Sequence, residues 1–201
     1  LMAHHDIHVS AEDIVVTPGA KQAMLYSFLI TTMPGDEVIL LAPSWASYEP
    51  MLEFIGAKPV HVQVRKDNFH PDLDAIKNAV TERTKMILIN SPCNPTGAVF
   101  TPEEIEGILD IATENDLWIV SDEIYSRMVW VDWPHVSPAS LPGGSERTIV
   151  VNGWSKSWAM TGMRLGFITG PPNAVKAAIK SQANSASVSY THLTLPTSPK
   201  V

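Results

Sequence analysis

The chain has 201 residues, of which 45% are hydrophobic, so it is long enough to bury the core of one domain or slightly more. Its 14 Lys and Arg residues against 21 Asp and Glu residues give a formal net charge of -7 without a long basic run, which argues against nucleic acid as a partner. No apolar run approaches the roughly 20 residues that cross a membrane as a helix, and the single cysteine, Cys93, leaves no internal disulfide, so we expect a cytoplasmic protein with no membrane partner.

Short β-branched and apolar runs alternate with helical patterns along most of the chain. We expect strands at residues 13–17, 38–41, 59–64, 85–89, 117–120, 148–151 and 165–169. We expect helices at residues 20–31, 45–55, 72–80, 102–115 and 174–182, and one surface loop at residues 132–144. The fourth helix has the clearest start, because Thr101, Pro102 and Glu104 match an N-cap, a first helical position and a capping box. The alternation predicts an α/β fold, a mostly parallel sheet with helices on both faces.

Three of the expected strands end in polar clusters. Their sequences are NSPCNPTG at residues 90–97, SDEIY at residues 121–125 and NGWSKSWAMTGMRLG at residues 152–166. Ligands of open α/β sheets bind at the carboxyl ends of the strands. We therefore expect an amide, an acid, a phenol and an amine to converge in one crevice. These four groups belong to Asn94, Asp122, Tyr125 and Lys156.

These motifs carry a resemblance to a known family. Asn-Pro-Thr-Gly, Ser-Asp-Glu-Ile-Tyr and Ser-Lys-x-x-Ala-Met-Thr-Gly-x-Arg-x-Gly resemble the motifs of the pyridoxal 5′-phosphate (PLP) aminotransferases of classes I and II, and the likeness runs from about Asp13 to about Ser181. Within that family the chain is most similar to the bacterial aspartate-type aminotransferases. The resemblance implies the PLP-binding large domain of a fold type I transferase. It also implies transfer of an amino group from an amino acid, with aspartate the donor that the subgroup suggests, to a 2-oxo acid.

The resemblance gives each residue of the crevice a chemical role. Lys156 would bond to the aldehyde of PLP and, once displaced by substrate, move the proton between the substrate Cα and C4′. Asp122 would pair with the ring nitrogen and keep the ring an electron sink, while Tyr125 and Asn94 would contact the phenolic oxygen. Position alone also allows simpler readings: Lys156 on the surface, Asp122 as the N-cap of a helix starting at Glu123, Tyr125 in the core and Asn94 in a turn.

A phosphate site is expected where the first strand passes into the first helix. Gly19 lets the backbone approach closely, and the free amides of Ala20 and Lys21 lie at the positive end of the helix dipole. As an isolated motif this is weak, because Pro-Gly before a helix is common. Arg164 resembles the family arginine that binds the phosphate through two parallel hydrogen bonds.

Two further positions bear on the cofactor. Many relatives have serine where this chain has Gly153, which puts one phosphate contact in doubt; Ser155 or Ser157 would partly replace it. Trp45 occupies the position where relatives place an aromatic ring against the pyridine face, and a tryptophan suits a cationic ring. Without the family, an aromatic residue near a helix start is more often part of the core.

Other functions remain open on the sequence alone. A fold type I lyase or decarboxylase would use the same PLP site, and some transcription regulators contain an aminotransferase-like domain that senses PLP or an amino acid. A helix-turn-helix segment upstream of Leu1 would favour the regulator. His4, His5 and His8 form a possible metal cluster, but they have no acidic or cysteine partners nearby, and we expect no metal site.

The two ends of the chain interrupt the family pattern. Residues 1–187 are expected to form the large domain, truncated at both ends, without the small domain that carries the arginine for the substrate carboxylate. Residues 188–201 break the preceding helical pattern and resemble the translation of a transposon-based sequencing adaptor. We expect them to be a non-native tail, the alternative being an ordinary disordered terminus. The full-length protein is expected to be a homodimer, and the fragment alone to be inactive.

Overall fold

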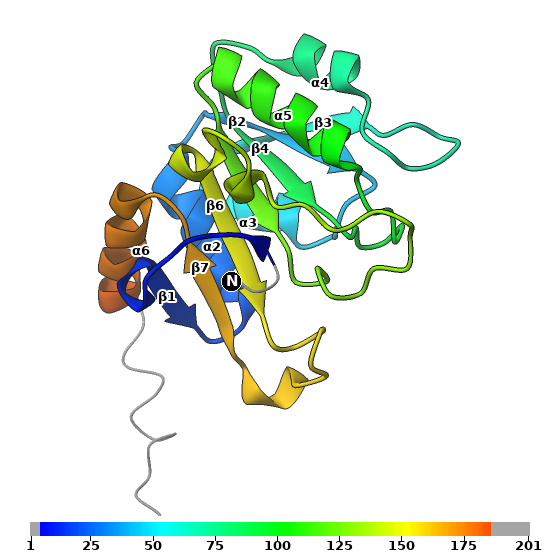
Figure 1. Cartoon of the computed structure of the whole chain (residues 1–201). Coiled ribbons are helices and arrows are strands. Elements are labelled where there is room, and N and C mark those ends of the chain that lie inside the picture. Colours follow the sequence, from blue (N-terminus) through cyan, green and yellow to red (C-terminus); the bar gives the residue numbers. More distant parts are fainter. Residues whose placement is uncertain (1–4, 186–201) are drawn as a thin grey trace, which may run out of the picture.

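The computed structural model describes residues 5–185, so the predicted tail at residues 188–201 lies outside the described residues. The strands of this part are β1 (Ile14–Thr17), β2 (Glu37–Ala42), β3 (Lys58–Gln63), β4 (Thr84–Asn90), β5 (Trp118–Asp122), β6 (Thr148–Gly153) and β7 (Gly166–Thr169). They form one sheet in the order β1-β7-β6-β5-β4-β2-β3 (Figure 1). Strands β2 to β6 pair in parallel, whereas β7 is antiparallel to both β6 and β1. The predicted mostly parallel sheet is confirmed.

The helices cover both faces of this sheet. They are α2 (Ala20–Thr31), α3 (Tyr48–Phe54), α4 (Leu73–Ala79), α5 (Pro102–Glu114) and α6 (Pro172–Ser185). Helices α2, α3 and α6 pack into one hydrophobic core, which includes Met24 and Leu52. Helices α4 and α5 pack into a second core with Ile76 and Ile108, and Figure 1 shows them together on one side of the sheet. None of the helices within residues 5–185 is long and apolar enough to span a membrane.

Burial explains why the central strands read as continuous apolar runs. Strands β4, β5 and β6 lie between two helical layers and are buried along almost their whole length, as is typical of parallel strands. The capping box of α5 also forms as predicted: Glu104 N donates to Thr101 Oγ1 at 3.3 Å, and Thr101 N donates to Glu104 Oε2 at 2.9 Å. Local and long-range patterns therefore agree for most of the fold.

One helix start and one loop differ from the predictions in a way that has a local cause. The helix expected at residues 45–55 begins only at Tyr48, because Trp45 and the residues after it form a turn in which Tyr48 N donates to Trp45 O at 3.1 Å. The loop expected at residues 132–144 contains a short 3-10 helix, Pro138–Ser140. Ser137 Oγ accepts from Ala139 N at 3.3 Å at its start, a local cap that the proline and glycine content of the segment obscured.

Candidate active site

A cavity of about 230 Å³ lies at the carboxyl ends of β4, β5 and β6. Nine of the ten predicted site residues line it, and they come from five separate stretches of the chain. They are Ala20, Lys21, Trp45, Asn94, Asp122, Tyr125, Ser155, Lys156 and Arg164. The tenth, Gly19, immediately precedes Ala20 at the start of α2. The structure therefore brings together the groups that the sequence placed at three strand ends and one helix start.

Asp122 lies at the buried floor of this cavity, with only 5% of its surface exposed. Its Oδ2 accepts a hydrogen bond from Tyr48 OH at 2.6 Å, and its Oδ1 accepts one from Ile124 N at 3.2 Å. Burial raises the pKa of Asp122 to about 6, although the hydrogen bonds from Tyr48 and Ile124 act in the opposite direction. A cationic group in the cavity would stabilise the ionised form of this carboxyl.

The alternative reading of Asp122 as a helix N-cap is wrong. Strand β5 extends through Asp122, and the residues that follow form a turn without a helix. Glu123 N donates to Val151 O at 2.8 Å, so the backbone continues to pair with β6 instead of entering a helix. The only feature of a cap that remains is the bond from Ile124 N to the Asp122 carboxylate.

Tyr48 is a site residue that the sequence analysis missed. It is 1% exposed, and burial together with the charge of Asp122 raises its pKa well above the ordinary value, so the phenol stays a proton donor. Its ring packs edge-on against Trp45, with centroids 5.2 Å apart and planes at 87°. The available signal was its position three residues after Trp45, which places both side chains beside the start of α3.

Asparagine side chains link β4 to the floor of the cavity. Asn90 Nδ2 donates to Asp122 O at 2.9 Å, and Asn90 Oδ1 accepts from Asn94 N at 2.7 Å. This arrangement holds Asn94 so that its Nδ2 donates to Tyr125 OH at 3.4 Å. Asn94 and Tyr125 are thus neighbours at one wall, as predicted, while Asn90 had not been singled out within its motif.

Lys156 stands on the exposed segment that follows β6. Its Nζ lies 5.8 Å from the centroid of the Tyr125 ring and faces the cavity. The segment is attached to the floor by Ser157 Oγ, which donates to Ile124 O at 3.2 Å. On the opposite side Lys21 Nζ lies 5.0 Å from the centroid of the half-buried Trp45 ring.

Arg164 and the start of α2 form the basic end of the cavity. Arg164 Nη1 donates to Thr161 O at 3.1 Å, and Nη2 donates to Pro18 O at 3.5 Å. Gly19 has φ 89°, and a Cβ atom at this position would lie 2.5 Å from Arg164 Nη2. A glycine is therefore required for the guanidinium to approach the helix start, where backbone amides are free to bind an anion.

Gly153 departs from the family pattern for a visible reason. A Cβ atom there would lie 2.7 Å from Leu165 O and 3.0 Å from Gly166 Cα, so the close approach of β7 leaves no space for a side chain. Ser155 lines the cavity two residues later, whereas Ser157 is bonded to Ile124 O and is not among the lining residues. Of the two predicted substitutes, only Ser155 faces the cavity.

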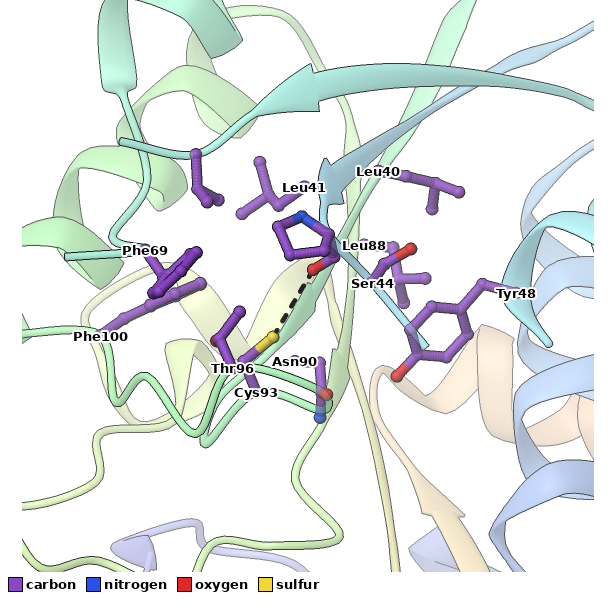
Figure 2. Close-up of a pocket in the computed structure, with 12 residues that line it drawn as sticks. Leu40, Leu41, Ser44, Tyr48, Phe69, Leu88, Asn90, Cys93, Thr96 and Phe100 are labelled. Carbon is purple, nitrogen blue, oxygen red and sulfur yellow. Dashed lines mark hydrogen bonds between the residues drawn. The ribbon is translucent and has the colours of Figure 1, made fainter. Parts of the chain in front are cut away.

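A second, smaller cavity adjoins the first, and Figure 2 shows the side chains around it. Its volume is about 10 Å³, it shares Tyr48 and Asn90 with the larger cavity, and Cys93 contributes Sγ 3.8 Å from Pro43 O. This volume holds one water molecule at most. Cys93 lines the small cavity and not the large one, which agrees with a packing role for its thiol.

Comparison with known proteins defines the family. The family model of aminotransferase class I and II matches residues 1–197, a range that extends into the predicted tail. An aspartate aminotransferase of Pyrococcus abyssi is 43% identical over 183 residues, which are 90% of this chain and 47% of that protein. The chain therefore belongs to the class I and II aminotransferases, whose members depend on PLP.

Solved structures agree in fold and extent. A mutant of Thermus thermophilus aspartate aminotransferase matches with a TM-score of 0.88 and 39% identity over 92% of this chain and 50% of that one. An aromatic aminotransferase of Pyrococcus horikoshii matches with a TM-score of 0.89 and 41% identity over the same shares. The predicted fold type I architecture is confirmed. The chain spans about half the length of the curated relatives it matches.

Proposed function

We propose that this chain forms part of a PLP-dependent transaminase and that the cavity at the ends of β4, β5 and β6 holds the PLP. The observation that carries the proposal is the meeting of an amine, a buried carboxyl, a phenol and an amide in that one cavity. PLP needs one group of each kind: an amine to bond its aldehyde, an acid for its ring nitrogen and donors for its phenolic oxygen.

The residues present fit the group at both ends. Asp122 is a buried carboxyl that gains from a cationic neighbour, as a protonated ring nitrogen would be. At the other end, the missing Cβ of Gly19 leaves a cradle beside Arg164, where a guanidinium and free amides of α2 suit a phosphate. Asn94 and Tyr125 lie on the wall between these two ends and supply donors for the phenolic oxygen.

Each residue then has a defined task. Bound PLP supplies an aldehyde that bonds reversibly to amines and a ring that accepts electron density. Lys156 Nζ would hold the cofactor through its aldehyde and would be the base that takes a proton from the substrate Cα. Asp122 would pair with a protonated ring nitrogen of the cofactor, and the hydrogen bond from Tyr48 fixes the orientation of that carboxylate. Trp45 covers one side of the cavity and excludes water from it.

We further propose that the whole protein uses aspartate as amino donor and a 2-oxo acid as acceptor, and that it works as a cytoplasmic homodimer. The names of several relatives support aspartate. The similarity to an aromatic aminotransferase makes donor size the point to test. Relative kcat/KM of the full-length protein for aspartate and phenylalanine, with 2-oxoglutarate as acceptor, decides this point. Release of carbon dioxide instead of the oxo acid would show a decarboxylase. The 201-residue chain alone should show no turnover.

Covalent labelling tests the cofactor site on the chain itself. We expect added PLP to produce a visible absorption band, and borohydride reduction to fix the PLP mass on the peptide that contains Lys156. Lys21→Ala is the matched control, because Lys21 also lines the cavity but contributes only its backbone amide to the proposal. Label on Lys21, or label distributed over surface lysines, would refute the proposed role of Lys156.

A further inference from the structure

Three buried side chains meet beside the candidate active site, on the far side of Asp122. His5 comes from the segment before β1, Glu123 directly follows β5, and His135 comes from the loop between β5 and β6. Their side chains are 7%, 0% and 5% exposed. His5 Nδ1 lies 3.2 Å and His135 Nε2 lies 3.3 Å from Glu123 Oε2, and the three atoms all lie within 4.8 Å of one another.

The three atoms that face one another lack hydrogen bonds. Within residues 5–185, His5 Nδ1, His135 Nε2 and Glu123 Oε2 are buried polar atoms without a hydrogen-bond partner. Their separations are short enough, but the ring N–H directions do not suit a bond to the carboxylate oxygen. A buried polar atom without a hydrogen-bond partner is rare and costly, and here three such atoms face one another at ion-pair distances from Glu123 Oε2.

Hydroxyl groups contact the second carboxylate oxygen of Glu123 and the second ring nitrogen of His5, whereas His135 Nδ1 has no hydrogen-bond partner among the described residues. Glu123 Oε1 accepts from Ser137 Oγ at 2.5 Å and from Ser121 Oγ at 3.0 Å, so the carboxylate is fixed with Oε2 toward the two imidazoles. His5 Nε2 lies 3.3 Å from Ser126 Oγ. Ligands of protein-bound metals are oriented by such outer hydrogen bonds, with one atom left for the ion.

We propose that His5, Glu123 and His135 bind one Zn²⁺, with a water molecule as fourth ligand. Two imidazole nitrogens and one carboxylate oxygen are a common zinc donor set, with bonds of about 2.0–2.2 Å. In a tetrahedral site such bonds place neighbouring ligand atoms about 3.3 Å apart, which matches both separations from Glu123 Oε2. The ion joins the segment before β1 and the loop after β5 to the strand that carries Asp122. The partners of His5 in this site are therefore far away in sequence, whereas His8 lies beside Asp6.

The test is zinc binding by the 201-residue chain after removal of metal with a chelator. We expect calorimetric titration and metal analysis to give one Zn²⁺ per chain, and a higher melting temperature with zinc than with chelator. His5→Ala and His135→Ala should each weaken binding by at least about tenfold. His70→Ala is the matched control and should bind normally, because His70 Nδ1 forms an ordinary contact of 2.7 Å with Glu104 Oε2.

A milder substitution keeps the proposal testable if the histidine variants fail to fold. Ser137→Ala keeps all three ligands and removes only one bond to Glu123 Oε1, so we expect about 10–100-fold weaker zinc binding with unchanged circular dichroism. Absence of stoichiometric binding by the unaltered chain would overturn the proposal. Equal affinity of the unaltered chain and the two histidine variants would overturn it as well, because the zinc would then bind elsewhere on the chain.

Discussion

The floor and the rim of the candidate active site are built in different ways. The floor is the end of β5, where Asp122 is buried and both of its carboxylate oxygens accept hydrogen bonds. The rim is the exposed segment between β6 and β7, which carries Lys156 and Arg164. The same segment exposes Trp158, Met160 and Met163 by 42%, 44% and 55%. The floor is thus held by buried hydrogen bonds, whereas the rim lies mostly at the surface, where side chains contribute less to stability.

The comparison predicts that rim variants lose function without losing stability. Lys156→Ala should lower transamination by the full-length protein by about 10²–10⁴-fold, the range for loss of a general acid–base group. The melting temperature of the PLP-free protein should stay the same, because the Lys156 side chain is exposed. Steady-state kinetics and thermal unfolding measure the two effects. A large fall in the melting temperature of that variant would show that Lys156 contributes to stability as the floor residues do, and would contradict the difference between floor and rim.

Asp122→Ala should affect both properties. The loss of the carboxylate should lower transamination by about 10²–10³-fold, with a smaller effect on PLP retention because the phosphate end is unchanged. Tyr48 then keeps a buried hydroxyl without its acceptor, which should cost about 1–3 kcal/mol of unfolding free energy. Kinetics, dialysis against PLP-free buffer and urea unfolding separate the three effects. PLP loss that exceeds the loss of rate would contradict the assignment to the ring nitrogen.

Arg164→Lys tests the basic end of the rim. A lysine keeps the charge but not the planar fork, so the half-time of PLP loss on dialysis should shorten by about tenfold. The matched control is Arg127→Lys, because Arg127 is also exposed but lies 4.5 Å from the Trp158 ring, outside the cavity lining. Equal rates of PLP loss from both variants would show that Arg164 does not bind the phosphate.

Tyr48→Phe should have the smallest effect and isolates the floor. It removes one buried hydroxyl and leaves the ring packed against Trp45, so the unfolding free energy should fall by about 1–2 kcal/mol. Tyr125→Phe is the comparison, since its hydroxyl has a longer contact of 3.4 Å and a half-buried position, and its loss should cost less. Urea unfolding measures both. A larger loss of unfolding free energy for Tyr125→Phe than for Tyr48→Phe would show that the contact between Asn94 and Tyr125 stabilises the fold more than the floor does.

Sequence patterns predicted the parts of this molecule that depend on neighbours along the chain. Buried runs became β4, β5 and β6, and the motif at Thr101 became the start of α5. The convergence of Asn94, Asp122 and Lys156 also followed, because parallel strands end at one edge of a sheet.

What escaped prediction depends on contacts between distant residues. The antiparallel direction of β7 is set by its pairing with β6 and β1, and its apolar run carries no sign of direction. Tyr48 reaches Asp122 across 74 positions of sequence. His5 was judged by its neighbours at the chain start, although its contact is Glu123. Each of these features needs the assembled sheet before it can be seen.

The neighbouring acids Asp122 and Glu123 have a consequence for the accuracy of folding. Their carboxylates enter opposite sides of the sheet, one beside Tyr48 and the other beside His5 and His135. Displacing β5 by one position against β4 and β6 would turn each acid toward the wrong layer and leave two buried charges among apolar side chains. The two adjacent acids therefore disfavour a shifted pairing of β5 and help to fix one register of the central strand.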